Sequence, residues 1–250
     1  WQGVFLIFAI MILASLAVLP LMRAPISATK AELEETLGIV LKRAFKDPSF
    51  TMIFLGFFSC GYQLAFISAH FPAFVTEMCG AIDPSSSLAA LGITTTSALG
   101  AVSISLIGLA NIVGTITAGA LGKRYSKKYL LAAIYVGRTV IAAAFILAPM
   151  TPGTVLLFSM LMGSLWLATV PLTSGLIAHI YGLRYMGTLY GIVFFSHQLG
   201  SFMGVWLGGR MYDLTGNYTL VWWIGVGIGA FSALVHLPIR EKPNSAPLAV

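Results

Sequence analysis

The sequence predicts an all-α, polytopic membrane helical bundle with about seven transmembrane helices. The first observation is composition, because the 250 residues are 58% hydrophobic and only 9% charged. A soluble domain has roughly 45–50% apolar and about 25% charged residues. A compact soluble domain cannot bury such an excess of apolar side chains, whereas a lipid bilayer can accommodate it. The lipid bilayer is therefore the first partner that we expect.

The second observation is a series of long apolar runs. A helix needs about 20 mainly apolar residues to cross the ~30 Å hydrocarbon layer. Runs of this kind occupy residues 4–22, 51–75, 102–121, 129–148, 155–180, 186–208 and 220–237. Each run predicts one transmembrane helix. The connection 23–50 is long, charged and amphipathic, which is typical of a helix lying parallel to the membrane surface.

The third observation is the distribution of the 14 lysine and arginine residues. Twelve of them fall in alternate connections and the C-terminal tail, whereas Arg210 alone falls in a connection on the opposite side. Basic loops stay in the cytoplasm, so the pattern predicts a cytoplasmic C-terminus and an external Trp1. The basic loops also account for the net charge of +6 without any nucleic acid as a partner. Seven helices with the N-terminus outside would be unusual for a complete protein. They would fit the last seven helices of a twelve-helix protein, so we expect five more helices before Trp1.

One connection contains a motif that is shared with a known family. Residues 119–128 read GALGKRYSKK, which resembles the loop motif G-x-L-[AG]-D-[RK]-x-G-[RK]-[RK] of the major facilitator superfamily of secondary transporters. Lys123 stands where the motif has an aspartate, so the charge relay of that acid is not carried over. A plain cytoplasmic anchor remains an alternative interpretation of the basic cluster.

A second motif, GRMYDLTGNY at residues 209–218, resembles the turn G-x-x-x-D-x-T-G-x-Y of the monocarboxylate and oxalate–formate porter group. Asp213 is expected to accept backbone hydrogen bonds there, and Gly216 to adopt a positive φ. In that group an Asp and an Arg four residues later bind the anion and the proton. The matching positions here are Asn111 and Thr115, so that charged pair is absent.

The resemblance implies that the chain consists of four parts. Residues 1–22 would be the last helix of an N-terminal half, and residues 23–50 a cytoplasmic central loop with an amphipathic helix. Residues 51–238 would form the six-helix C-terminal half of a transporter, followed by a cytoplasmic tail at 239–250. The missing N-terminal half of the same chain is then an expected partner.

Arg138 is the one basic residue inside a predicted transmembrane helix. It lies about ten residues into its run, near mid-membrane at ~1.5 Å per residue. An arginine at this depth costs about 2.5–3.5 kcal/mol on insertion scales and usually faces a cavity. It could bind an anionic substrate or pair with an acid on a helix outside this chain. It could equally cap carbonyls or form a structural pair, and both interpretations stay open.

Polar and aromatic residues at helical spacing form further stripes that could line a pathway. With Arg138, the candidate substrate-binding residues are Gln63, Phe66, His70, Asn111, Thr115, Trp166, Tyr190, Phe194 and His197. Such stripes also serve as contacts between helices. His197 is preferred as a protonatable contact because Gln198 keeps its turn polar, whereas His179 and His236 are expected at the membrane interface. The spacing of Gly200, Gly204 and Gly208 predicts close helix packing.

These features predict a secondary active transporter of a small organic solute, with an organic anion as one candidate, working by alternating access. A proton or another coupling ion is a further expected partner. The location is a multi-pass one in a plasma or bacterial inner membrane. A non-transporting receptor or scaffold of the same fold is the main alternative.

A membrane-embedded enzyme is a weaker alternative, because it would need a catalytic constellation. The four histidines are scattered, and the eight acidic residues lie in loops, at helix ends or in the tail. Cys60 and Cys79 do not have the spacing of a metal site. We therefore expect no catalytic residue, no metal and no cofactor.

Overall fold

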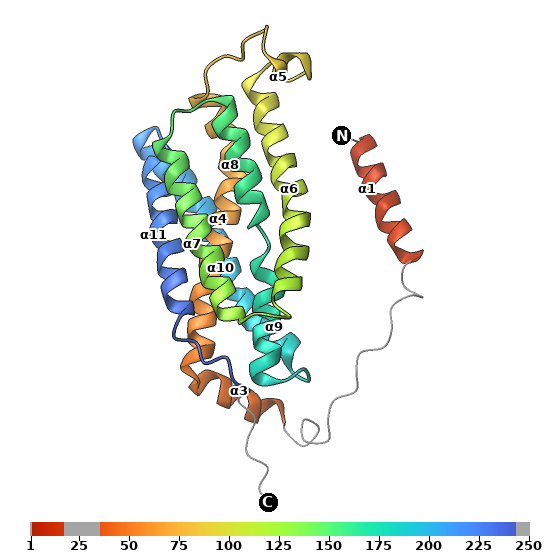
Figure 1. The fold of residues 1–250 in the computed structure, drawn as a ribbon, viewed down its shortest axis with the longest axis vertical. Helices are drawn as coiled ribbons and strands as arrows, with labels where there is room; N and C mark the ends of the chain where they lie inside the picture. The colour runs from red at the N-terminus through yellow and green to blue at the C-terminus, as the bar shows by residue number, and fades with distance from the viewer. Residues whose placement is uncertain (1, 18–35, 244–250) are drawn as a thin grey trace, which may run out of the picture. The chain divides into compact units, whose positions relative to one another are not determined.

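The computed structural model describes residues 2–17 and 36–243. The chain divides into two units, residues 1–34 and 35–250. The described helix of the first unit is α1, Gln2–Ser15. The second unit contains α3 (Leu37–Lys46), α4 (Pro48–Met78), α5 (Ser87–Ala90), α6 (Thr96–Leu121), α7 (Lys127–Leu147), α8 (Pro152–Ser164), α9 (Thr169–Tyr181), α10 (Met186–Thr215) and α11 (Thr219–His236) (Figure 1).

The described segments confirm an all-α membrane fold. Five are long and apolar enough to cross a bilayer, namely α4, α6, α7, α11 and the span Pro152–Tyr181 that contains α8 and α9. Helix α10 is also long, at 30 residues, but its serine, histidine, glutamine and glycine residues lower its hydropathy. In α1 the described helix has 14 residues, and residues 18–35 lie outside the described part. The predicted number of seven spans is therefore not confirmed.

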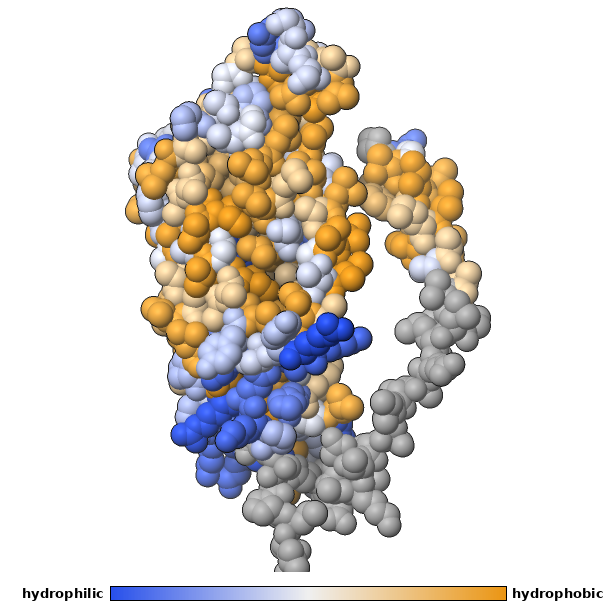
Figure 2. Space-filling view, in the orientation of Figure 1, coloured by the Kyte–Doolittle hydropathy of each residue, from blue (hydrophilic) through white to orange (hydrophobic). Residues whose placement is uncertain are grey.

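The surface of the second unit matches a protein that lies in lipid. Figure 2 shows apolar side chains over the middle of the bundle and hydrophilic ones gathered at the end that carries α3 and α9. On α6, Leu109, Ile112, Val113 and Ile116 are each more than half exposed. In water such a face would lose the free energy gained by burying apolar area, whereas acyl chains can cover it.

Local signals in the sequence set the helix ends. The Asp47 side chain accepts a hydrogen bond from the Ser49 N–H at 2.8 Å, and Pro48 takes the first turn of α4. Thr95 caps α6 in the same manner. Gly216 ends α10 with a φ of +69°, as predicted for the second motif. Asp213, however, lies inside α10 because the helix continues to Thr215.

Helices α4 and α10 pack with their backbones close together. A Cβ added to Gly61 of α4 would overlap the carbonyl oxygen of His197. A Cβ added to Gly200 would in turn overlap the carbonyl oxygen of Phe58, and Gly204 and Gly208 also face α4. The predicted close packing along this glycine stripe is thus confirmed. Its effect is to bring side chains on both helices to the same interior space.

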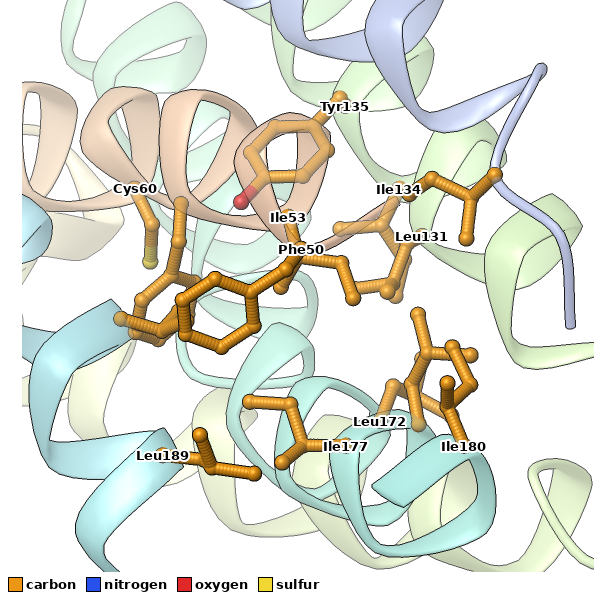
Figure 3. Close-up of a cluster of buried hydrophobic side chains, with 14 of the residues drawn as sticks. Phe50, Ile53, Cys60, Leu131, Ile134, Tyr135, Leu172, Ile177, Ile180 and Leu189 are labelled. Carbon is orange, nitrogen blue, oxygen red and sulfur yellow. The ribbon is translucent and has the colours of Figure 1, made fainter. Parts of the chain in front are cut away.

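The buried side chains form two clusters. The first joins α3, α4, α7, α9 and α10, and Figure 3 shows part of it, with Cys60 and Tyr135 at one end and the aliphatic side chains Leu172, Ile177 and Ile180 of α9 at the other. The second is rich in aromatic rings from α4, α7, α8 and α11. Cys60 and Tyr135 also belong to the polar site described next.

Candidate functional site

The predicted helix 155–180 is broken in the structure. Helix α8 ends at Ser164 and α9 starts at Thr169, because residues 165–168 leave the helical path. Within a membrane, backbone groups released by such a break need partners inside the protein. Discontinuous helices of this kind form binding sites in many transporters. The expectation of one continuous helix was therefore wrong at this point.

Asn111 of α6 supplies one of the partners that the break needs. Its side-chain oxygen Oδ1 accepts the Leu167 N–H at 2.9 Å. The Thr115 hydroxyl donates to the same oxygen at 3.1 Å. Gly114 lies between them along α6, and an added Cβ there would overlap the Ser164 carbonyl. Asn111 thus holds α6 against the break between α8 and α9, and Thr115 bonds to the Asn111 side chain within α6.

Arg138 of α7 is completely buried, with 0% of its surface exposed. Its Nη1 donates a hydrogen bond to the Cys60 sulfur at 3.5 Å. Its Nε and Nη2 have no hydrogen-bond partner among the described residues. Acidic residues within this part of the chain, such as Glu77 and Asp213, lie at helix ends, in loops or in the tail. Arg138 therefore has no carboxylate partner in the described bundle, although a buried charge is costly without one.

Polar groups from four helices surround this guanidinium. The Cys60 sulfur lies 3.3 Å from Thr169 Oγ1 and interacts with His197. Tyr135, one helical turn before Arg138, interacts with Cys60, Arg138 and Tyr190. We call these residues the Arg138 cluster, which comprises Cys60, Tyr135, Arg138, Thr169, Tyr190 and His197. The hydroxyls of Tyr135 and Tyr190 lack a hydrogen-bond partner within the described chain.

The cluster also includes the start of α9. Thr169 is the first residue of this helix, and Ala168 before it has no capping side chain. The Val170 N–H bonds to the Leu167 carbonyl at 3.0 Å and Pro171 has no N–H, so this helix start contributes mainly the partial positive charge of its dipole. Together with the guanidinium and the tyrosine hydroxyls, the cluster offers many hydrogen-bond donors and, among the described residues, no carboxylate. Such a set of groups is suited to an anion.

Three predicted site residues on α4 face other helices instead. Gln63 Nε2 donates to the Gly225 carbonyl of α11 at 3.0 Å. Phe66 packs edge-on against Trp222, with ring centroids 5.1 Å apart. His70 Nε2 lies 3.0 Å from the Val205 carbonyl of α10. The structure therefore places this stripe in contacts between helices, which was the alternative interpretation of it.

The remaining predicted residues lie near the cluster or the break. Tyr190 and His197 belong to the cluster, and Phe194 stacks on His197 with centroids 5.0 Å apart and planes 8° apart. Phe194 is 36% exposed and His197 only 9%, so this ring pair lies between the cluster and the surface of α10. Trp166 lies in the break itself and packs against both buried clusters.

Cys60, Tyr135 and His236 were not among the predicted site residues. Tyr135 lies three residues before Arg138, and residues at this spacing are neighbours on one face of a helix. This spacing could have predicted that Tyr135 lies beside Arg138. His236, which was expected at the membrane interface, is the last residue of α11, and its side chain is fully buried. Its ring stacks on Tyr135 at 5.0 Å and its Nδ1 lies 2.7 Å from the Ser232 carbonyl. It thereby supports the cluster from the α11 side.

Comparisons with known proteins agree with this architecture. The chain is 32% identical over 89 residues to an uncharacterized MFS-type transporter, YcxA, of Bacillus subtilis (strain 168), a match that covers 35% of this chain and 22% of that protein. The fold is similar to that of the fucose:proton symporter FucP of E. coli, with a TM-score of 0.63 and 16% identity. That likeness covers 93% of this chain and 53% of the symporter. The chain thus spans about half or less of the length of these relatives.

The family model of the Major Facilitator Superfamily matches residues 1–205 and 82–250. The two matches together extend over the whole chain, and the helical membrane bundle described above has the fold that the resemblance implied. This chain belongs to the Major Facilitator Superfamily of membrane transporters.

Proposed function

We propose that this chain is the C-terminal portion of a secondary active transporter that moves a small organic anion by alternating access. The observation that carries the proposal is Arg138, a fully buried guanidinium with two unpartnered nitrogens and no carboxylate partner in the described bundle. A charge at this depth is usually retained for function. An anionic group of the solute would supply the negative charge that the bundle lacks.

The Arg138 cluster has the donors to hold a carboxylate. A guanidinium presents paired N–H groups that a carboxylate accepts in a bidentate manner. The hydroxyls of Tyr135 and Tyr190, which have no hydrogen-bond partner among the described residues, would bind the remaining lone pairs. The aromatic rings of Phe57 and Phe194, which both pack against His197, would contact an apolar body of the solute.

Access to the cluster requires movement, because Arg138 is enclosed in this conformation. The break at residues 165–168 provides a joint at which α9 can tilt relative to α8. Movement of α9 would separate Thr169 from Cys60 and open the side of the cluster next to α10. We propose that this local opening accompanies the rocking of two halves, of which residues 51–238 form one. Residues 1–22 would be the last helix of the other half, and residues 23–50 the central loop.

A proton is the coupling ion to test first. Imidazole side chains are common proton carriers in proteins, and His197 is the imidazole of the Arg138 cluster. The symporter of similar fold is named for fucose and a proton, which supports the choice of the ion but not of the sugar. We further propose that the protein belongs to the monocarboxylate and oxalate–formate porter group. We also propose that it lies in a plasma or bacterial inner membrane with its C-terminus in the cytoplasm.

The test is uptake by the full-length protein in proteoliposomes, measured with radiolabelled carboxylates, amino acids and neutral sugars. We expect carboxylate uptake that Arg138→Met lowers at least a hundredfold and that Arg138→Lys restores in part. Arg210→Gln is the matched control, because it removes an exposed arginine near the C-terminal end of α10, away from the Arg138 cluster. Uptake of neutral sugars alone, or normal uptake by Arg138→Met, would contradict the anion assignment.

The same experiment separates a transporter from a receptor or scaffold of the same fold. A receptor would bind a carboxylate, seen as a rise in thermal stability that depends on Arg138, without any uptake or counterflow. A transporter shows both the stability shift and counterflow. Absence of uptake for all solute classes would favour the receptor.

A further inference from the structure

A second polar region lies at the end of the bundle where the α6–α7 connection meets the chain after α11. A pocket of about 790 Å³ opens there. Its lining contains the basic residues Lys123, Arg124, Lys127, Lys128, Arg240 and Lys242. His179 of α9 also lines it, and Glu241 is its acidic residue. The pocket therefore has a strong positive charge, and its lining shares no residue with the Arg138 cluster.

Part of this charge is already used within the protein. Glu241 accepts hydrogen bonds from the Ser126 hydroxyl and from the Lys127 N–H at 2.9 Å. Its carboxylate also lies 3.8 Å from Lys127 Nζ. Lys128 Nζ donates to the Leu237 carbonyl at 3.0 Å. Lys127 and Lys128 thus hold the chain after α11 against the start of α7.

The other four basic residues are directed to solvent. Lys123, Arg124, Arg240 and Lys242 are exposed, and Glu241 is already engaged with the start of α7. Four cations around one concave surface repel one another unless an anion lies between them. The charge of the pocket therefore favours an anionic ligand, such as one that carries a phosphate group.

An apolar groove of about 390 Å³ is lined by α6 and α7, and also by Ser164, Leu165 and Ala168 at the break between α8 and α9. Its lining includes Val113, Leu121, Leu130, Ala133 and Ile134. On α6 the groove ends at Leu121, and the next residue, Gly122, lines the basic pocket. On α7 the groove is lined from Leu130 onward, and Lys128, two residues before it, lines the basic pocket. The linings of the two hollows are thus close to each other along both helices.

Two tyrosines mark the junction between the groove and the basic pocket. Tyr125 and Tyr129 are 61% and 58% exposed. Exposed tyrosines of this kind gather at the level of lipid headgroups, because their rings are apolar and their hydroxyls polar. The junction therefore has the chemistry of the boundary between acyl chains and headgroups.

We propose that this surface is a binding site for an anionic phospholipid, with the headgroup phosphate in the basic pocket and one acyl chain in the groove between α6 and α7. The charge favours an anionic over a zwitterionic headgroup. The adjoining groove favours a lipid over a soluble phosphate, because a free anion gains nothing from apolar walls. The proposal does not depend on the solute or on the Arg138 cluster.

The test uses the full-length protein in detergent, titrated with phosphatidylglycerol or phosphatidylcholine and observed by native mass spectrometry. Phosphatidylglycerol should bind at least tenfold more tightly. Lys123→Gln combined with Arg124→Gln should weaken its binding about thirtyfold, from the contribution of two surface charges. Lys42→Gln combined with Lys46→Gln on α3 removes the same charge elsewhere and should leave binding unchanged.

The groove is tested separately with Ala133→Trp, which fills it without changing charge. This variant should weaken the binding of phosphatidylglycerol while leaving the binding of glycerol 3-phosphate, a headgroup without chains, unchanged. Equal binding of the two lipids, or equal effects of the two charge pairs, would overturn the proposal. Binding of glycerol 3-phosphate as tight as that of the lipid would overturn it in favour of a soluble anion. Thermal unfolding of each variant verifies that the fold is intact.

Discussion

The side-chain oxygen of Asn111 accepts the backbone N–H of Leu167 at 2.9 Å, and so joins α6 to the gap between α8 and α9. This bond connects Asn111, a residue that the sequence singled out, to the helix break next to the Arg138 cluster. Asn111 thus supports the helix break from a neighbouring helix.

Asn111→Leu is expected to leave the Leu167 N–H buried without an acceptor. An unsatisfied buried donor costs about 1–3 kcal/mol, so the thermal unfolding temperature of the purified protein should fall. Thr115→Val is the matched control, because it removes a donor to Asn111 but leaves the Leu167 bond in place. Equal loss of stability in the two variants would show that the Asn111–Leu167 bond does not support the break.

Gly61→Ala is expected to separate α4 from α10, because the new Cβ would overlap the His197 carbonyl oxygen. Overpacking of this kind costs typically about 1–3 kcal/mol. Gly191→Ala on α10 is the control, since no atom lies within 4 Å of the position of its Cβ, and alanine favours a helix over glycine. Thermal unfolding should show a loss for Gly61→Ala and no loss for Gly191→Ala. The opposite order would contradict the close packing of these helices.

Glu241→Gln is expected to change how stability depends on pH. Burial acts to raise the pKa of Glu241, but hydrogen bonds from Ser126, Lys127 and Lys128 and the Lys127 ammonium outweigh it and lower the pKa below its usual value. A carboxyl with a lowered pKa stabilises the folded state above its unfolded pKa, about 4.3. That stability is lost as the pH falls through the lowered value.

Thermal unfolding at pH 7 and at pH 4 and below measures this effect. The wild type should lose more stability on acidification than Glu241→Gln, which should already be less stable at pH 7. Asp213→Asn removes an exposed acid at the end of α10 and is expected to follow the wild type. A pH dependence of Glu241→Gln identical to that of the wild type would exclude this carboxylate as the group that titrates.

His197→Phe separates the chemistry of the ring from its packing. Phenylalanine can keep the stack on Phe194 but has no ring nitrogen to interact with Cys60. We expect the protein to remain folded in the membrane while uptake falls at least tenfold. His70→Phe is the control, because His70 contacts the backbone of α10 away from the cluster. Normal uptake by His197→Phe would remove His197 from the proposed site.

Several site residues were visible in the sequence, but their neighbours were not. Arg138 was singled out because one cation inside an apolar run is costly wherever it points. Tyr190 and His197 followed from helical spacing, which places residues on one face. Spacing does not say what that face meets. Gln63 and His70 share a stripe of the same form, yet they bond to α11 and α10.

The sequence by itself determined the membrane class, the helical fold and several helix ends. These properties follow from local causes, namely hydropathy, Asp47 and Thr95 as caps, and Gly216 at a left-handed turn. Only the tertiary structure decided that residues 155–180 break into two helices and that Cys60, Tyr135 and Arg138 meet. The physical reason is that each depends on a partner from another helix, Asn111 for the break and α4 for the arginine. No local pattern in one segment encodes the position of another.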